Sequence, residues 1–335
     1  MISIETFLPS QTHWLFAELP AALYAPDVFR LQRSSDTINM QYAATGIAAL
    51  QDGKVVGRLV LYAETGISIP GKNVVVMGNY ECVKDEKISA ELINAAENFA
   101  RMEGYNFILG PMNGTTWDTY RFCTNPEAGT FFSEMIHQSY YPQQWEKAGF
   151  TQMADYISTI DKIISCDKKA TLELEQKFIA NDIRFRSIDL NQYEQELSSL
   201  FSLCEKAFAK NFLYTPISWE IFRDKYLAVR PYIVPEMVLI AERADGSPAG
   251  FAFNFPDHLC KTEKRMILKT LARDPANDLK GLGDVLGNLS QRYARDHKFN
   301  SIIHALIYSG NYSRDLSEQY SSSVFKHYAL YSKEV

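Results

Sequence analysis

An internal repeat is the feature that most limits how this chain folds. The segment "DGKVVGRLVLY" (52–62) resembles "DGSPAGFAFNF" (245–255), because each has a turn, a glycine and then an alternating apolar strand. Further on, "VVVMGNYECVKD" (74–85) matches "RMILKTLARD" (265–274), and each is an apolar strand that ends in an acidic residue. A sequence pattern that recurs in both halves of a chain is expected to fold into two similar domains.

The next pair of matching segments predicts one amphipathic helix in each half. "ISAELINAAENFARMEGYNFILG" (88–110) matches "GLGDVLGNLSQRYARDHKFNSIIHAL" (281–306), with apolar residues such as Leu92 and Phe99 at helical spacing. A polar turn, an aromatic residue and a buried strand follow each helix. Both halves also begin alike, with a strand ("MISIETFL" and "IRFRSIDL") before a helix. This order predicts an α/β fold of the α+β type with a mixed sheet in each half.

The boundary between the halves is expected near residue 165. There "DKKATLELEQKFIAND" (167–182) reads as a charged amphipathic helix that is suited to be a linker. The sequence thus predicts an N-terminal domain over 1–165 and a C-terminal domain over 166–335.

Composition and charge limit the class of protein. The chain has 335 residues, of which 46% are hydrophobic and 22% charged, and its formal net charge is −6 with no run of Lys and Arg, which disfavours nucleic acid as a partner. No apolar run approaches the roughly 20 residues that span a bilayer, and the N-terminus lacks a secretory signal pattern, so we expect a cytoplasmic protein that does not enter membranes. The five cysteines form no C-x-x-C pair, which favours reduced thiols; they are Cys82, Cys123, Cys166, Cys204 and Cys260.

The two copies differ in the loop before the repeated helix. Asp85 and Tyr105 are 20 positions apart in the first half, whereas Asp274 and Phe299 are 25 positions apart in the second. Most of the excess lies in "DPANDLK", which leads to the second helix. If this loop holds a phosphate group, only the second half has kept it.

A glycine pair at the start of the second helix suits a diphosphate. Gly281 and Gly283 allow the backbone to approach phosphate oxygens, the first amides of a helix lack intrahelical partners, and its dipole favours an anion. Lys280 adds a positive charge at the rim. An ordinary strand-to-helix loop that binds nothing has the same short pattern, so the motif alone leaves both readings open.

The context of this loop resembles the acetyl-coenzyme A core of the GNAT superfamily of N-acyltransferases. In that family the loop reads Gln/Arg-x-x-Gly-x-Gly/Ala; here Gly281 and Gly283 match, whereas Asp278 replaces the Gln or Arg. The first half, with "GPMN" and "YYP" followed by "GF", looks like a group of uncharacterised bacterial proteins with two such domains. Most of the chain is covered by the resemblance, which implies two tandem GNAT-like domains.

The resemblance implies acetyl-coenzyme A or another acyl-coenzyme A as co-substrate, bound by the second domain. The strand "MILKTLA" is expected to present backbone groups to the pantetheine arm, and the loop amides are expected to bind the diphosphate. The residues expected at this site are Leu271, Ala272, Arg273, Lys280, Gly281, Leu282, Gly283, Asp284 and Asn311.

Catalytic residues are less well defined by the sequence. A tyrosine often protonates the leaving thiolate in this family, and Tyr320 is the candidate, with Tyr328 and Tyr331 as rivals. Glu81 is the candidate general base and Glu134 a second choice. The six histidines show no spacing typical of a metal site, so no metal is expected. His304 reads as a core histidine bonded to backbone, and Asp161 as a surface residue.

Two aromatic clusters in the first half are candidates for binding the acceptor. In "GPMNGTTWDTYRF" (110–122), Asn113, Trp117, Tyr120 and Arg121 combine an apolar wall with a clamp for a carboxylate or phosphate. Tyr140 and Tyr141 form the second cluster, for which a place in the domain core is an equally good interpretation. Arg121 is harder to explain by packing, because a buried guanidinium needs a partner.

The most favoured function is transfer of an acetyl or acyl group from coenzyme A to the amine of a small molecule or peptide. A transfer of amino acids from charged transfer RNA, as in peptidoglycan-bridge enzymes, is a second enzymatic hypothesis. A degenerate GNAT-fold protein that binds or senses a ligand is the third, and Asp278 and Asp284 favour it, since both place negative charge near the loop. The sequence leaves the acceptor, the acyl length and the oligomeric state open.

Overall fold

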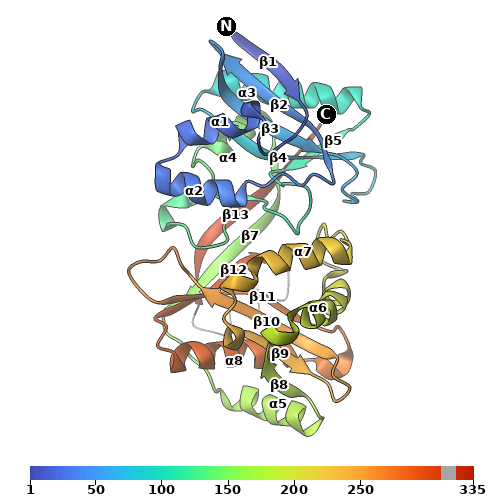
Figure 1. The fold of residues 1–335 in the computed structure, drawn as a ribbon, viewed down its shortest axis with the longest axis vertical. Helices are drawn as coiled ribbons and strands as arrows, with labels where there is room; N and C mark the ends of the chain where they lie inside the picture. The colour runs from blue at the N-terminus through green and yellow to red at the C-terminus, as the bar shows by residue number, and fades with distance from the viewer. Residues whose placement is uncertain (311–321) are drawn as a thin grey trace. The chain divides into compact units, whose positions relative to one another are not determined.

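The structure is a computed structural model that describes residues 1–310 and 322–335, and its chain divides into two compact units (Figure 1). Unit 1 comprises Met1–Tyr156 and Lys326–Val335, and unit 2 comprises Ile157–Phe325. Along the chain the division falls after Tyr156, before the boundary near residue 165 that the sequence suggested. The C-terminal residues return to unit 1.

Unit 1 is built on a sheet with the strand order β1-β2-β3-β4-β5-β13. Helices α1 and α2 precede β2, and α3 connects the parallel strands β4 and β5. Its elements are β1 (Ile2–Phe7), α1 (Trp14–Leu23), α2 (Pro26–Ser35), β2 (Ala43–Gln51), β3 (Lys54–Tyr62), β4 (Val74–Cys82), α3 (Glu86–Met102), β5 (Phe107–Gly110), β6 (Phe122–Cys123), η1 (Pro126–Ala128), α4 (Tyr141–Lys147) and most of β13 (Ser322–Glu334).

Unit 2 repeats this plan with the strand order β8-β9-β10-β11-β12-β7. Its elements are α5 (Lys169–Ala180), β8 (Arg184–Ser187), η2 (Leu190–Gln192), α6 (Tyr193–Phe208), α7 (Trp219–Val229), η3 (Arg230–Tyr232), η4 (Pro235–Met237), β9 (Val238–Glu242), β10 (Pro248–Pro256), β11 (Arg265–Arg273), η5 (Asn277–Leu279), α8 (Leu282–Asp296) and β12 (Ser301–Tyr308). Strand β7 (Thr151–Asp161) begins in unit 1 and ends in unit 2.

The register of the strands confirms the repeat seen in the sequence. Gly57 of β3 lies opposite Cys82 of β4, and Gly250 of β10 lies opposite Arg273 of β11. The helix that follows, α3 or α8, leads in each unit to a strand that pairs in parallel with the strand before it. Each sheet therefore mixes parallel and antiparallel pairs, as predicted.

The last strand of each sheet was not predicted from the sequence. In unit 1 the sixth position is taken by β13, which pairs antiparallel with β5 although it comes from the C-terminal end of the chain. In unit 2 the same position beside β12 is taken by β7, which follows the first half of the sequence. Each sheet is thus completed by a strand that the sequence repeat assigns to the other half.

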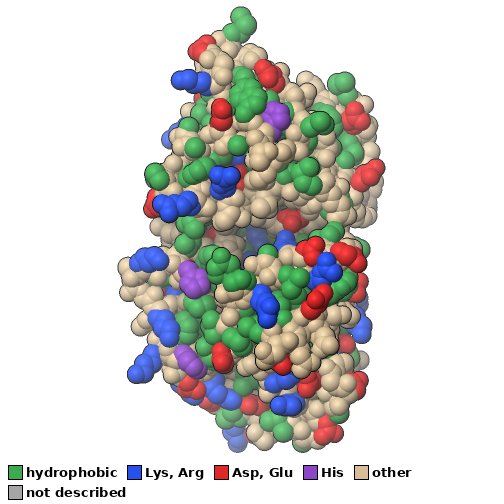
Figure 2. Space-filling model, in the orientation of Figure 1, with side chains coloured by type: hydrophobic (Ala, Val, Ile, Leu, Met, Phe, Trp, Pro, Cys, Tyr) green, Lys and Arg blue, Asp and Glu red, His purple; other side chains and the backbone are tan. Residues whose placement is uncertain are grey.

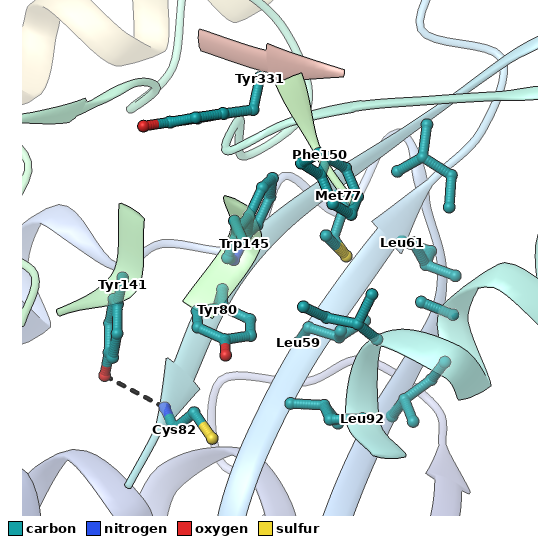
Figure 3. Packing of buried hydrophobic residues seen from close by; sticks show 14 of the residues in the cluster. Leu59, Leu61, Met77, Tyr80, Cys82, Leu92, Tyr141, Trp145, Phe150 and Tyr331 are labelled. Atoms are coloured by element: carbon teal, nitrogen blue, oxygen red, sulfur yellow. Dashed lines mark hydrogen bonds between the residues drawn. The ribbon is translucent and has the colours of Figure 1, made fainter. Parts of the chain in front are cut away.

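The core of unit 1 lies between the sheet and helices α3 and α4 (Figure 3). Leu59, Leu61 and Met77 from the strands meet Leu92 of α3 and the indole of Trp145, and all of these side chains are fully buried. The other face of this sheet is covered by α1, whose Phe16 ring stacks on the guanidinium of Arg58. Alternation along the strands thus supplies two buried faces.

The helix that the sequence suggested as a linker is present as α5, but it is part of unit 2. Its Phe178 is buried in the core cluster of that unit together with Leu282 and Leu286 of α8. An amphipathic helix with a buried aromatic residue has a folded partner, so α5 is a packed element of unit 2.

Helices of the described residues are too short or too polar to cross a bilayer. Within the same residues no three His, Cys, Asp or Glu side chains gather as a metal ion requires. Figure 2 shows that acidic and basic side chains are interspersed on one face of the molecule.

Candidate functional site

Helix α8 of unit 2 begins without a side-chain cap. Its N-cap residue is Gly281, whose φ of 93° lies in the left-handed region that only glycine adopts without strain. The amides of Asp284 and Val285 bond to the carbonyl of Gly281, and within the described residues the N-cap makes no side-chain capping bond. The first amides of the helix, those of Leu282 and Gly283, therefore lack intrahelical partners. They lie at the positive end of the helix dipole, as an anion site requires.

The loop that precedes α8 is tied to the sheet. Asp274 accepts a hydrogen bond from the amide of Ala276 at 3.0 Å and forms an ion pair with Arg243 at 3.1 Å. Arg273 donates to the carbonyl of Asp274 at 2.8 Å. The loop is thereby fixed at its strand end, while Lys280 is exposed next to the N-cap.

Strand β11 loses its parallel neighbour just before this loop. Its pairing with β12 ends where Leu268 lies opposite His304, whereas its pairing with β10 continues to Arg273. A Cβ added to Gly283 would lie 3.2 Å from the side chain of Leu271, so the end of β11 and the start of α8 are adjacent. The structure brings together the predicted strand and loop residues of the co-substrate site.

The corresponding helix start in unit 1 is closed. Asp85 is the N-cap of α3, and its carboxylate accepts hydrogen bonds from the amides of Lys87 at 2.8 Å and Ile88 at 3.1 Å. A carboxylate in this place satisfies the same amides and the same dipole that a phosphate would use. The loops that differ in sequence thus also differ in structure, because α3 is capped by a carboxylate and the N-cap of α8 makes no side-chain hydrogen bond within the described part of the chain.

The gap between β4 and β5 in unit 1 is also filled by the chain itself. The pairing of β4 with β5 ends at Val76 and Leu109, and the segment after β5 then bonds to β4. Met112 donates its amide to the carbonyl of Met77 at 3.0 Å, and the Asn113 side chain accepts from the amide of Asn79 at 2.8 Å. The backbone groups of β4 are therefore bonded to this chain's own residues.

Gly78 allows this close approach, which leads to a first prediction. A Cβ at this position would lie 2.1 Å from the carbonyl oxygen of Met112, well inside contact distance. Gly78→Ala is expected to destabilise unit 1 by about 1–3 kcal/mol, measured as a lower urea midpoint by circular dichroism. Gly57→Ala in the same unit is the control, because its φ is not positive and the nearest atom to its added Cβ is a side-chain methyl of Leu92 at 3.1 Å, which can move, so a smaller loss is expected. An unchanged midpoint for Gly78→Ala would contradict the tight fit.

Glu81 lies in a buried network of unit 1. The side chain is 3% exposed, and its carboxylate accepts hydrogen bonds from Tyr24 at 2.9 Å, Gln32 at 2.7 Å and Tyr141 at 2.5 Å. Burial raises the pKa of Glu81 to about 7, against the lowering effect of Arg58 and of the tyrosine hydroxyls. A carboxyl group with this pKa exchanges protons near neutral pH, as a general base must, but here its oxygens are bonded to protein donors.

The second aromatic cluster lies around this network. Tyr141 is fully buried and also accepts a hydrogen bond from the amide of Cys82 at 3.1 Å, as Figure 3 shows. Tyr140 is half-buried, and its hydroxyl donates to the carbonyl of Cys82 at 2.9 Å. Of the two interpretations of this cluster, its geometry matches a place in the core of unit 1.

The first aromatic cluster is different in character. The chain folds back after β5, so that Arg121 donates its amide to the carbonyl of Pro111 at 2.9 Å. Trp117 and Tyr120 are half-buried, whereas Arg121 is only 6% exposed and has a φ of 68°. This group therefore joins partly accessible aromatic rings to a buried cation.

Two predicted residues, Asn311 and Tyr320, lie outside the described residues. The rival tyrosines are in the core of unit 1, where the hydroxyl of Tyr328 donates to Glu134 at 2.5 Å and that of Tyr331 donates to Glu146 at 2.9 Å. Both acidic candidates for the general base, Glu81 and Glu134, are thus buried partners of tyrosines.

One polar cluster was missed by the sequence analysis. Asp161 is fully buried in unit 2. Its carboxylate bonds to the ring of His304 at 2.9 Å and accepts a hydrogen bond from the side-chain amide of Gln291 at 2.5 Å. The expectation of a surface aspartate was wrong, because β7 joins the sheet of unit 2 and brings Asp161 beside β12. His304 bonds to this carboxylate, and no local sequence pattern links the two residues.

Comparisons with known proteins identify the fold. No protein-family model matches the sequence, and no curated protein matches it. Solved structures do match. A GCN5-related N-acetyltransferase from Sphaerobacter thermophilus has a TM-score of 0.53 and 12% identity, and the match covers 99% of this chain and 95% of that one. A tandem GNAT protein from the clavulanic acid biosynthesis pathway has a TM-score of 0.54 and 12% identity, with 99% and 98% covered.

A further match is a glucosamine N-acetyltransferase region of a fungal multi-domain GH3 β-N-acetylglucosaminidase. Its TM-score is 0.58 and its identity 11%, and the match covers 99% of this chain but only 38% of the fungal chain. The chain therefore has the tandem GNAT fold over its whole length, which confirms the fold expected from the sequence. At these identities the similarity establishes the architecture and not the chemistry of the site.

Proposed function

We propose that the protein is an N-acyltransferase that moves an acetyl or longer acyl group from coenzyme A to an amine. The observation that carries this proposal is the uncapped start of α8 beside the end of β11, in a chain with the fold of tandem N-acetyltransferases. The contrast with unit 1 supports it, because there the same helix start holds Asp85 and the same strand edge holds Asn113.

Unit 2 supplies the proposed site for the acyl-coenzyme A. The amides of Leu282 and Gly283 would hold the diphosphate, and Lys280 would add charge at the rim. The edge of β11 that has lost β12 would pair with the pantetheine arm, as an added strand would. Backbone amides near Leu271 would polarise the thioester carbonyl.

The reaction would form an amide and release a thiol. The lone pair of the amine attacks the thioester carbonyl carbon, the carbon–sulfur bond breaks, one proton leaves the nitrogen and one proton joins the sulfur. Tyr320 remains the predicted proton donor and Asn311 a predicted contact to the arm. Glu81 remains the predicted base, and its buried hydrogen bonds would have to open for that role.

One observation favours a second candidate, a protein that binds acyl-coenzyme A without turnover. The register of the two units places Ala272 of β11 at the position that Glu81 occupies in β4. Unit 2 therefore has no carboxylate at this position of its own strand, and a base would have to come from elsewhere.

Calorimetry and a thiol-release assay would test both candidates. We expect acetyl-coenzyme A or a longer acyl-coenzyme A to bind the purified chain with a single site, and thiol to be released when a suitable amine is added. Binding without release across a panel of small-molecule and peptide amines would favour the second candidate. An absence of heat with every acyl-coenzyme A would contradict both.

A further inference from the structure

The guanidinium of Arg121 is a buried cation without an acidic partner among the residues that the structure describes. Its side chain belongs to unit 1, is 6% exposed, and its Nε and Nη1 atoms are buried and donate no hydrogen bond within the described part of the chain. Burying a cation without hydrogen bonds is strongly unfavourable, so such a group is rarely left in this state.

The two other cations buried in unit 1, among the described residues, are each paired with a carboxylate. Arg58 donates to the carboxylate of Asp36 and to the carbonyl of Asn79. Lys326 is 2% exposed and donates to Glu134 at 2.8 Å. The chain thus pairs its structural cations with carboxylates, and Arg121 departs from this rule.

Two tyrosine rings accompany Arg121 but do not replace hydrogen-bond acceptors. The guanidinium carbon lies 3.9 Å from the ring centre of Tyr120 and 4.4 Å from that of Tyr156. Rings that stack on a guanidinium leave its N–H groups, which lie in its plane, in need of oxygen acceptors. Arg58 combines both kinds of contact, because it stacks on Phe16 at 3.8 Å and both of its terminal nitrogens donate to oxygen atoms.

The backbone holds Arg121 in a conformation that is unfavourable for this residue type. Its φ of 68° lies in the left-handed region, and the bond from its amide to Pro111 keeps it there. Outliers of this kind are kept where the surrounding structure needs the side chain in one place. Tyr120, whose ring lies against the guanidinium, is itself half-buried, and the half-buried Trp117 lies in the same segment.

We propose that Arg121, flanked by Tyr120 and Tyr156, is a binding site in unit 1 for an oxyanion, either a carboxylate or a phosphate group of a small molecule. The oxyanion would accept hydrogen bonds from the Nε and Nη1 groups of Arg121, which donate none within the described residues, and its charge would neutralise the cation. This site does not depend on acyl transfer in unit 2, and it is tested without coenzyme A.

Thermal unfolding of the full chain with simple anions tests the proposal. Sodium phosphate and sodium succinate are compared with sodium chloride at the same ionic strength, so that general screening is held constant. At about ten times the dissociation constant, a bound oxyanion is expected to raise the unfolding midpoint by about 3 °C. The anion with the larger effect distinguishes a phosphate site from a carboxylate site.

Variants assign the effect to this residue. Arg121→Met is expected to lose the anion-dependent rise, while Arg101→Met, which removes an exposed arginine of the same unit, is expected to keep it. If Arg121→Met does not fold, Arg121→Lys replaces it; lysine cannot form the paired bonds of a guanidinium, and its apparent anion affinity should fall at least several-fold. The proposal is overturned if the wild type responds to neither anion beyond chloride, or if the Arg121 variant that folds responds like the wild type.

Discussion

Replacing Gly281 with glutamate is expected to abolish the binding of acyl-coenzyme A, with a loss of affinity of about 100-fold or more. The new carboxylate would occupy the positive end of the α8 dipole, where the diphosphate is proposed to bind, and would repel it. The added Cβ would also lie 3.2 Å from Leu174, and the φ of 93° would strain any residue with a Cβ. Calorimetry with acetyl-coenzyme A measures the loss.

Gly246→Glu is the matched control for this prediction. Gly246 also lies in unit 2 and has a φ of 83°, and a Cβ there meets nothing within 4 Å. The same charge and the same backbone strain are thereby introduced away from α8. We expect this variant to bind acyl-coenzyme A like the wild type. Equal binding by Gly281→Glu would exclude the loop as the diphosphate site, and equal loss in both variants would attribute the effect to folding.

The repeat made the architecture of each unit predictable. Matching apolar strands and helices at fixed spacing define β3, β4 and α3 in one half and β10, β11 and α8 in the other, because local periodicity determines these elements. The sixth strand of each sheet was not predictable in this way. Which strand completes a sheet depends on contacts between residues far apart in sequence, and β7 and β13 carry no local signal of their partners.

The candidate site shows the same division between local and distant information. The open helix start at Gly281 and the closed one at Asp85 follow from nearby residues, since capping is a local interaction. The surroundings of Asp161 and Glu81 depend on distant residues. Asp161 was misjudged because its partner His304 comes from another strand, and Glu81 meets Tyr24 and Tyr141 only in the folded unit.

The contribution of Glu81 to the stability of unit 1 is expected to fall as the pH rises from about 4.5 to 7. Burial lowers the pKa of His137 in the same unit to about 4, and this acts in the opposite direction below pH 6.5. Burial raises the pKa of the Glu81 carboxyl from its ordinary value of 4.5 to about 7, so in this range the folded state holds a proton that the unfolded state releases. Because the folded state binds more protons than the unfolded state in this range, the stabilisation that Glu81 contributes falls as the pH rises. It is fully lost above pH 7. A shift of this size corresponds to about 3 kcal/mol.

Glu81→Gln is expected to remove this dependence and to make the protein more stable than the wild type above pH 7. The substitution keeps the shape, and the new amide oxygen still accepts from Tyr24 and Tyr141. The new amide nitrogen would face Gln32, whose side-chain oxygen is buried without a partner within the described residues and becomes an acceptor when its amide group turns. Urea midpoints of both proteins at pH 5, 6, 7 and 8 measure the difference, and Glu91→Gln on the exposed side of α3 controls for the lost charge. A Glu81→Gln variant whose midpoint changes with pH in parallel with that of the wild type would show that Glu81 remains ionised in the folded core.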